Sequence, residues 1–581
     1  MTTIIRSVLL PAFLSLVVAG RTAQAVNPPP DGCYASFTTA EGCYALFSLG
    51  TGQGNTAIGH DALFSDTTGS WNTGVGAVAL GFNDGDFNTA VGAAALLLNT
   101  TGGQNTAVGT AALVSNDTGA DNTAIGNNAL YSNTIGGRNT AVGSLALFSN
   151  TGDNSRNTAV GSEALFSNTD GHENTATGAS ALRENTGGSH NAAFGASALS
   201  ANATASNNSA IGWAALASNT GGHENTANGA SALQTNSNGS YNVAIGASAL
   251  SSNTFGSENT AIGYGALFSN VGAGANTAVG SNTLVSNTAM RNTAIGASAL
   301  ENNTGGFNNT ADGFQALIFN DTGNNNTATG AFALSASTTG DTNTANGVNA
   351  LVANTSGDSN TAIGFGALFA NTTGSENIGI GHGGGGNVTN ANNVIAIGTE
   401  GANVSNSCYI GNIFGANVNG GTAMPVSVDA DGKLGTVAVS ARRFKDDIRP
   451  MDKASEAILA LKPVAFHYKA DRKAMPRYGL VAEDVAVVNP NLVTRNKNAE
   501  IIGVQYDQVW NMLLNEFLKE HRNGAEQDCK IQEQEAIIAE LRSEIRNLAA
   551  MVNEQASQLQ KVSAQLEIRN TAAQEIASNR P

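Results

Sequence analysis

The chain has 581 residues, of which 41% are hydrophobic, 12% are charged and 6% are aromatic, and 69 are glycines. This length exceeds that of one compact domain, and the composition is too apolar for a disordered low-complexity segment and too poor in large side chains for a thick globular core. The net charge is −17, and all of it falls before residue 440, where Lys433 is the first lysine. Such an acidic surface repels a phosphate backbone, so we expect no nucleic-acid partner.

Residues 1–25 have the features of a secretory signal peptide. Arg6 supplies a sparse basic region, residues 7–19 are apolar, and residues 23–25 read Ala-Gln-Ala, a typical cleavage site. The apolar stretch is too short to span a bilayer. We therefore expect a secreted or cell-surface protein, with an uncleaved anchor as the alternative.

Residues 26–50 are expected to cap the structure that follows. Cys33 and Cys43 both stand in a Gly-Cys-Tyr-Ala context, and after export they could form a disulfide that holds the first coil. Cys408 and Cys529 have no such partner, and no cysteine spacing suggests a metal site.

A repeat of about 17 residues dominates residues 51–411, with weaker copies at 393–398 and 408–411. Its unit reads Asn-Thr-Ala-(Ile/Val)-Gly-x-x-Ala-Leu-x-x-Asn-Thr-x-Gly-x-x. A period this short cannot hold a helical hairpin, but it suits one turn of a β-solenoid. The first asparagine of the unit recurs at positions 55, 72, 88, 105, 122, 139, 157, 174, 191, 208, 225, 242, 259, 276, 292, 309, 326, 343, 360 and 377.

The unit also predicts the local structure of each coil. Thr-Ala-Ile-Gly should form a short strand ended by glycine, and Asn-Thr-x-Gly a turn in which asparagine and glycine tolerate positive φ. Identical positions should then stack in rows. The unbroken leucine row from Leu63 to Leu368 and the alanine row before Ile/Val should form the interior. The Ile/Val position accepts Asn228 and Asp312, so it should lie near water.

The 17-residue repeats give little indication of a binding site. Its five histidines sit at corner positions without forming one row, which favours solvated loop residues over metal ligands, and we expect no metal and no cofactor. The nonapeptide of calcium-binding β-rolls is absent. Rows of Asn and Thr could bind ice or glycans, but hydrogen bonds within the turns are the favoured interpretation. The histidines are His60, His172, His190, His223 and His382.

The repeats resemble the head repeats of trimeric autotransporter adhesins, in which a similar Asn-Ser-Val-Ala-Ile-Gly unit builds a trimeric left-handed β-roll. The resemblance covers about residues 50–411. It implies a trimeric fibre. Because the adhesin unit is usually shorter, the resemblance leaves the handedness and the coil shape of this solenoid open.

Composition changes after Gly421, where the repeats have ended. The segment from Val426 to Gly435 predicts a β-hairpin, because Asp431 and Gly432 form a typical hairpin turn.

Ser440 and Lys445 form a Ser-x-x-x-x-Lys pair directly after this linker. A serine hydroxyl becomes a nucleophile when a base takes its proton, and a lysine can be that base when it is neutral. Burial and the nearby Arg442 and Arg443 favour the neutral lysine, whereas the two aspartates that follow favour the charged form. The spacing alone carries little weight, because such pairs are common by chance.

Four motifs, of which the first contains Ser440 and Lys445, make a chance occurrence of this pair less plausible. Together they resemble the endosialidase-type intramolecular chaperone of phage tail spikes and bacterial surface proteins, which is also a serine peptidase, over about residues 436–545. The motifs are Ser440-x-Arg442-Arg443-Phe444-Lys445-x-x-Ile448, Ile458-Leu459-Ala460-Leu461-Lys462-Pro463-Val464-x-Phe466-x-Tyr468, Tyr478-Gly479-Leu480-Val481-Ala482-Glu483-Asp484-Val485 and Val504-x-Tyr506.

The resemblance implies a domain that trimerises the fibre upstream and then releases itself. Ser440 would attack the carbonyl of Val439 with Lys445 as general base, so that the chain is cut between Val439 and Ser440. The chain departs from the family at Ala441, where Asp or Ser is usual, and this bears on the rate of cleavage. For residues 479–485 we expect core packing and a turn rather than a catalytic role.

Residues 526–569 predict a coiled coil, because apolar residues recur in two rows at intervals of seven. β-Branched residues in one row and leucines in the other favour two strands, whereas the buried glutamines and the family resemblance favour three, which we expect. One long helix folded back on its own domain is the alternative. The rows are Ile531, Ile538, Ile545, Val552, Leu559 and Leu566, and Gln534, Leu541, Leu548, Gln555 and Val562.

The predicted fold is therefore mainly β: a β-solenoid or β-roll rod, then a small α/β chaperone domain and a coiled-coil helix. The predicted function is a secreted or cell-surface homotrimeric fibre that cleaves itself once, and the alternative is an adhesive fibre that keeps its C-terminal domain as a permanent trimer clasp. No receptor is indicated. The expected divisions are a signal peptide (1–25), an N-terminal cap (26–50), the solenoid (51–411), a hairpin linker (412–439), the chaperone and peptidase domain (440–525), the coiled coil (526–569) and a polar tail (570–581).

Overall fold

The computed structural model divides the chain into two compact units, Met1–Ala416 and Asn417–Pro581, which we describe separately. The predicted signal peptide, Cys33, Val439 and Ser440 lie outside the described residues. The structure describes residues 37–153, 155–413, 416, 426–428, 432–436, 441–469, 475–496 and 498–577.

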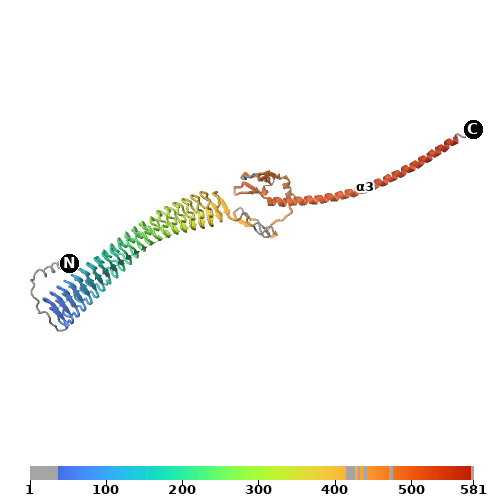
Figure 1. Ribbon diagram of the computed structural model, residues 1–581. Coiled ribbons are helices and arrows are strands. Elements are labelled where there is room, and N and C mark those ends of the chain that lie inside the picture. The colour runs from blue at the N-terminus through green and yellow to red at the C-terminus, as the bar shows by residue number, and fades with distance from the viewer. Residues whose placement is uncertain are drawn as a thin grey trace. The chain divides into compact units, whose positions relative to one another are not determined.

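The first unit is the predicted β-solenoid, in which one three- or four-residue strand per coil joins a single 23-stranded sheet. Each strand pairs in parallel with the next one along the chain, and equivalent repeat positions face each other, as Thr89 faces Thr106. Figure 1 shows the coils stacked in chain order. The strands are β1 (Thr39–Glu41), β2 (Thr56–Ile58), β3 (Thr73–Val75), β4 (Thr89–Val91), β5 (Thr106–Val108), β6 (Thr123–Ile125), β7 (Thr140–Val142), β8 (Thr158–Val160), β9 (Thr175–Thr177), β10 (Ala192–Phe194), β11 (Ser209–Ile211), β12 (Thr226–Asn228), β13 (Val243–Ile245), β14 (Thr260–Ile262), β15 (Thr277–Val279), β16 (Thr293–Ile295), β17 (Thr310–Asp312), β18 (Thr327–Thr329), β19 (Thr344–Asn346), β20 (Thr361–Ile363), β21 (Ile378–Ile380), β22 (Val394–Ile397) and β23 (Ser407–Ile410).

The interior of the solenoid consists of the leucine and alanine rows, as the repeat predicts. Every leucine of this row from Leu63 to Leu368 is fully buried, together with the strand alanines such as Ala90. The Ile/Val position also behaves as expected, because Ile125 is 41% exposed and Ile363 is 42% exposed. Alternate residues of a strand point to opposite faces, so the alanine points into the coil and its Ile/Val neighbour points outward.

Two rows of asparagines lie inside the coil beside this apolar core. The leading-asparagine row contains the first asparagine of each unit, and the second asparagine row contains that of Asn-Thr-x-Gly. In one coil the amide nitrogens of Asn88 and Asn99 both donate to the carbonyl of Gly102, at 2.8 and 2.7 Å. Each row also bonds to the coil before it: the Asn88 N–H donates to Asn72 Oδ1 at 2.8 Å, and Asn99 Nδ2 donates to Asn83 Oδ1 at 2.6 Å. The buried amides are therefore satisfied within and between coils.

The positions with positive φ differ from those that the repeat predicts. In the coil that begins at Asn88, positive φ occurs at Gly92, Ala94, Leu96 and Gln104, whereas the Asn-Thr-x-Gly segment has none. That prediction was wrong, because these asparagines serve as buried hydrogen-bonding groups rather than as flexible turn residues. The left-handed conformation costs a leucine about 1 kcal/mol, and full burial of its side chain offsets this cost.

The second asparagine row contains two substitutions whose effects identify its role. Ser337 replaces one asparagine, and without an amide from that position Asn320 Oδ1 has no partner among the described residues. Asp66 replaces another, is fully buried and accepts a hydrogen bond from the Gly69 N–H at 2.9 Å through Oδ1, while its Oδ2 has no partner there. Burial raises the pKa of Asp66 to about 7, against a smaller lowering by Gly69.

The second unit contains short elements and one long helix. The hairpin predicted after the repeats is confirmed, because β24 (Val426–Val428) pairs antiparallel with β25 (Leu434–Thr436). Two further antiparallel pairs follow, and the second of them packs with α2 around Val485, Leu492 and Met512. The other elements are the 3-10 helices η2 (Arg442–Phe444), η3 (Asp452–Ala460) and η4 (Pro490–Leu492), the strands β26 (Val464–Phe466), β27 (Arg477–Gly479), β28 (Val493–Arg495) and β29 (Ile501–Val504), and the helices α2 (Ala482–Val488) and α3 (Tyr506–Ala577).

Helix α3 has 72 residues and includes the whole predicted coiled-coil segment (Figure 1). Its apolar residues at intervals of seven are exposed in the single chain, including Ile531 at 52%, Ile545 at 63% and Leu559 at 68%. Within the described part of the chain, no helix has both the length and the apolar character needed to cross a membrane. The described cysteines Cys43, Cys408 and Cys529 are free thiols, and the pairing of Cys43 with Cys33 stays a prediction.

We predict that Asp66→Asn stabilises the N-terminal coils above neutral pH. Because the folded state raises the pKa of Asp66 from 3.8 to about 7, the native state holds the proton more tightly, and stability falls as pH rises between these values. At pH 8 the substitution should increase local stability by about 2–4 kcal/mol, and at pH 4 it should have little effect. Amide hydrogen exchange in residues 56–92 measures this local stability. An equal pH dependence in both proteins would contradict the assignment.

Candidate functional site

The structure places one member of the predicted Ser-Lys pair. Lys445 follows the short helix η2, and its backbone N–H donates to the carbonyl of Arg442 at 3.1 Å. The Lys445 side chain is exposed in the single chain. Ser440 and Val439 lie outside the described residues, so the pairing of serine and lysine stays a prediction.

The charges next to Lys445 are partly neutralised by an internal ion pair. Arg449 binds Asp447 through two contacts, Nε to Oδ1 at 2.7 Å and Nη2 to Oδ2 at 2.6 Å. This two-point geometry orients the carboxylate toward Arg449. The neighbouring Arg442 and Arg443 are exposed. Part of the negative charge that follows Lys445 is therefore paired within the same segment.

The separated motifs of the family resemblance meet around Tyr506. The hydroxyl of Tyr506 accepts a hydrogen bond from the Leu480 N–H at 3.0 Å. A Cβ on Gly479 would lie 2.9 Å from that hydroxyl and 3.2 Å from Phe466, so only glycine fits between the two rings. Three of the four motifs thus form one packed cluster. Glu483 is exposed in the first turn of α2, where its negative charge interacts favourably with the positive end of the helix dipole.

A hollow of about 260 Å³ opens beside this cluster. It lies between the end of η3 and helix α2 and is lined by Leu461, Leu480 and Val485, with Lys462 and Asp484 at its edge.

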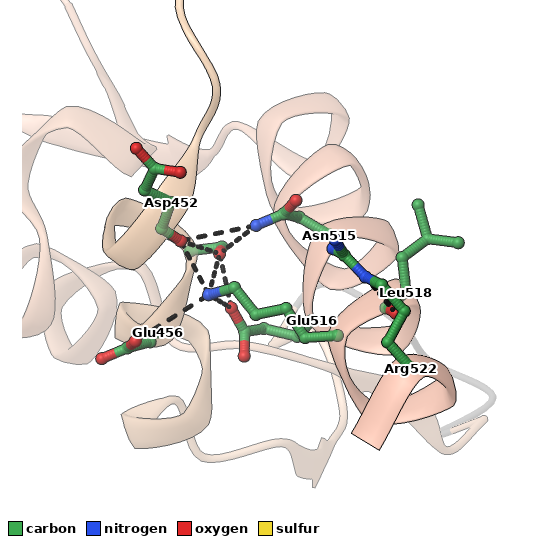
Figure 2. A network of polar contacts seen from close by, with 8 residues as sticks. Asp452, Glu456, Asn515, Glu516, Leu518 and Arg522 are labelled. Atoms are coloured by element: carbon green, nitrogen blue, oxygen red, sulfur yellow. Dashed lines mark hydrogen bonds and ion pairs between the residues drawn. The ribbon is translucent and has the colours of Figure 1, made fainter. Parts of the chain in front are cut away.

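A polar network joins η3 to α3 and surrounds the fully buried Ser455 (Figure 2). Asn515 Nδ2 donates to Ser455 Oγ at 2.7 Å, and Ser455 Oγ donates to Glu516 Oε1 at 2.5 Å. Lys519 Nζ donates to Glu516 Oε1 and to the carbonyl of Asp452, both at 2.7 Å. These contacts link segments that lie about 60 residues apart in the chain.

The charge pattern of this network indicates a structural role. The Lys519 ammonium, and secondly the Ser455 hydroxyl, hold the pKa of the Glu516 carboxyl below its usual range. Lys519 is thus engaged as a cation, and a cationic lysine cannot take a proton from Ser455. The network fixes η3 on α3. Sequence reasoning missed it, because nothing in either segment marks the other as its partner.

A second group of polar side chains lies outside the predicted Ser-Lys pair. His172, Glu173 and His190 come together at the surface of the solenoid, with their ligand atoms all within 4.8 Å of one another. His172 and His190 occupy different positions of the repeat, so they form no row. They are neighbours because one stands at the end of its coil and the other at the end of the next.

Comparison with known proteins identifies part of the second unit. Residues 440–494 match the profile of a peptidase family described as the chaperone of endosialidase. Searches of curated proteins and of solved structures each found no match. The chain therefore combines a β-solenoid with a following segment, residues 440–494, that matches the endosialidase-chaperone family.

We predict that Ser455→Ala destabilises the second unit by about 1–3 kcal/mol, because it leaves the amide of Asn515 and one contact of Glu516 without their partner. Hydrogen exchange of the η3 amides and urea unfolding measure the effect. Ser543→Ala, on the exposed surface of α3, is the matched control and should be neutral. Equal stability of the two variants would show that the network contributes nothing.

Proposed function

We propose that the protein is a secreted or cell-surface homotrimeric fibre whose C-terminal unit assembles three chains and then cuts itself off between Val439 and Ser440. The observation that carries this proposal is the match to the endosialidase-chaperone family, which begins at Ser440, the residue proposed to start the released fragment. A solenoid of the fibrous type stands directly upstream. Export rests on the signal-like residues 1–25.

The proposed reaction is an acyl transfer within the chain. Ser440 Oγ attacks the carbonyl carbon of Val439 while the neutral amine of Lys445 takes the hydroxyl proton. The peptide C–N bond breaks, the α-amine of Ser440 receives a proton, and the acyl group passes to the serine oxygen as an ester. Water then hydrolyses this ester, which yields a carboxylate at Val439 and a new N-terminus at Ser440. No cofactor is needed for either step.

The exposure of Lys445 supports an order of events. A lysine acts as a base when it is neutral, and burial favours the neutral amine because it penalises the charge. In the single chain this side chain is exposed. We therefore infer that cleavage follows assembly, when a neighbouring chain covers the segment. The fibre would lose its assembly domain only after the three chains are in register, and it could not easily reverse its assembly afterwards.

The exposed seam of α3 supports association of the chains. Apolar side chains repeat every seven residues along the helix and remain half-exposed or more in one chain. Exposed apolar rows of this kind are buried when helices form a coiled coil. Gln534 and Gln555 in the seam favour three strands over two. Helix α3 continues from the domain core near Met512, so the seam would hold three copies of that core together.

We predict that the full-length protein yields a fragment of 142 residues that begins at Ser440. Ser440→Ala and Lys445→Ala should each leave the chain intact, because one lacks the nucleophile and the other lacks the base. Denaturing gels with mass spectrometry of the fragment measure the cut. Lys453→Ala, a lysine in η3 of the same unit, is the matched control and should cleave normally. An intact wild-type trimer would instead support the permanent clasp.

We predict that the uncleaved Ser440→Ala protein sediments as three chains. Ile545→Asp places charges in the seam of α3 and should shift the protein to monomers at micromolar concentration. Ser543→Asp adds the same charge outside the seam and should leave the trimer unchanged. Analytical ultracentrifugation distinguishes the states, and a two-chain species would overturn the trimer.

A further inference from the structure

The last position of the repeat unit forms a row along the surface of the solenoid. Arg156, Glu173 and His190 occupy this position in three successive coils, and all three have positive φ, at 43, 57 and 59°. Because their backbones share one conformation, their side chains leave successive coils in similar directions. His172 precedes Glu173 and therefore lies next to the same row. The coil geometry thus brings two imidazoles and one carboxylate together.

The contacts within this group are close. His190 Nε2 lies 3.0 Å from Glu173 Oε2, and the rings of His172 and His190 are 5.1 Å apart at their centroids. The backbone holds both histidines in place: the His190 N–H donates to the carbonyl of His172 at 3.1 Å, and the His172 N–H donates to Ser189 Oγ at 3.1 Å. The coils that carry the ligands are therefore joined to each other beneath the site.

We propose that His172, Glu173 and His190 form a binding site for a divalent transition-metal ion, with Zn²⁺ as the best fit. Imidazole nitrogens together with one carboxylate suit Zn²⁺, whereas Ca²⁺ and Mg²⁺ prefer oxygen ligands alone. The three ligand atoms lie within 4.8 Å of one another. Metal–ligand distances of about 2.0–2.2 Å require the atoms to draw together by rotation of the side chains, without movement of the backbone. Water would complete the coordination.

Arg156 orients the carboxylate of Glu173 as a metal ligand. Its Nη1 lies 2.8 Å from Glu173 Oε1, whereas the histidine faces the other oxygen, Oε2. The hydrogen bond from Arg156 to Oε1 holds the carboxylate in this orientation. A partner of this kind orients a metal ligand from behind. Arg156 is a positioning residue, and it leaves Oε2 as the ligand atom.

The position of the site along the solenoid suggests what the metal would do. The step from β7 to β8, Thr140 to Thr158, is 18 residues, one more than the usual period. Arg156 ends this longer coil, and Glu173 and His190 end the two coils after it. A bound ion would tie these coils together at the edge of the irregular segment, and binding to the folded state alone stabilises it by mass action.

The chain contains an internal comparison for this site. The tripeptide Gly-His-Glu at 171–173 recurs at 222–224, where Tyr241 stands at the position that corresponds to His190. The rings of His223 and Tyr241 are 5.8 Å apart and also meet edge to face, so the geometry is similar. The second imidazole is missing there, and Asn207 stands at the position that corresponds to Arg156. The substitution Tyr241→His should therefore create a second metal site.

The test is calorimetric titration of ZnCl₂ into the full-length protein, prepared without a histidine tag and freed of metal. We expect one Zn²⁺ per chain. His172→Ala and His190→Ala should each weaken binding at least about tenfold, and Arg156→Ala should weaken it less because it removes an orienting contact. His223→Ala is the matched control and should bind as the wild type does. Co²⁺ absorption spectra report the coordination independently of heat.

Two outcomes would overturn the proposal. Wild-type protein that binds no Zn²⁺, or that binds it equally well after His190→Ala, does not use this site. Tyr241→His gives the complementary test, because it adds a ligand instead of removing one. A rise from one ion to two per chain supports the geometric argument, and an unchanged stoichiometry contradicts it.

Discussion

The solenoid depends on one constraint: each buried asparagine amide needs hydrogen-bond partners, which come from its own coil and from the neighbouring coils. An unpaired amide in an apolar interior costs about 1–3 kcal/mol, so a coil that slipped by one residue would lose several bonds at once. The hydrogen bonds between Asn83 and Asn99 and between Asn72 and Asn88 show this coupling. The constraint explains why one residue type recurs at two positions of almost every unit, and why Ser337 leaves Oδ1 of Asn320 in the preceding coil without a partner among the described residues.

The same arrangement limits what a single solenoid can bury. One leucine and a few alanines per coil make a thin core, and the Ile/Val row on the outer face of the sheet stays partly exposed. Helix α3 has the same property, because its heptad residues have no partner in one chain. Both units thus carry apolar rows whose spacing repeats along their length. The proposed trimer follows from these rows together with the endosialidase-chaperone match, and the proposed cut would come after they are covered.

Much of the fold could be predicted because it depends on short-range pattern. The period defined the coil, the alternation in Thr-Ala-Ile defined which residue points inward, and Asp431-Gly432 marked a hairpin whose strands β24 and β25 are confirmed. The burial of the asparagines could not be predicted, because a turn asparagine and a buried one look alike until the coil closes. The prediction of positive φ at those residues was wrong for this reason, whereas Leu96 adopts it.

The sequence by itself determined the repeat, its inner and outer rows, the heptad seam of α3 and the Ser440 and Lys445 hypothesis, since each of these rests on neighbouring residues or fixed spacing. Only the tertiary structure decided which distant side chains meet. Ser455 contacts Glu516 across the interface of η3 and α3, and His190 comes beside Glu173 because successive coils stack. The 17-residue spacing of Glu173 and His190 places them in one row, but the contact between their side chains depends on how the coils close. Nothing in the types or spacing of Ser455 and Glu516 marks them as partners, because their contact depends on how two distant segments pack.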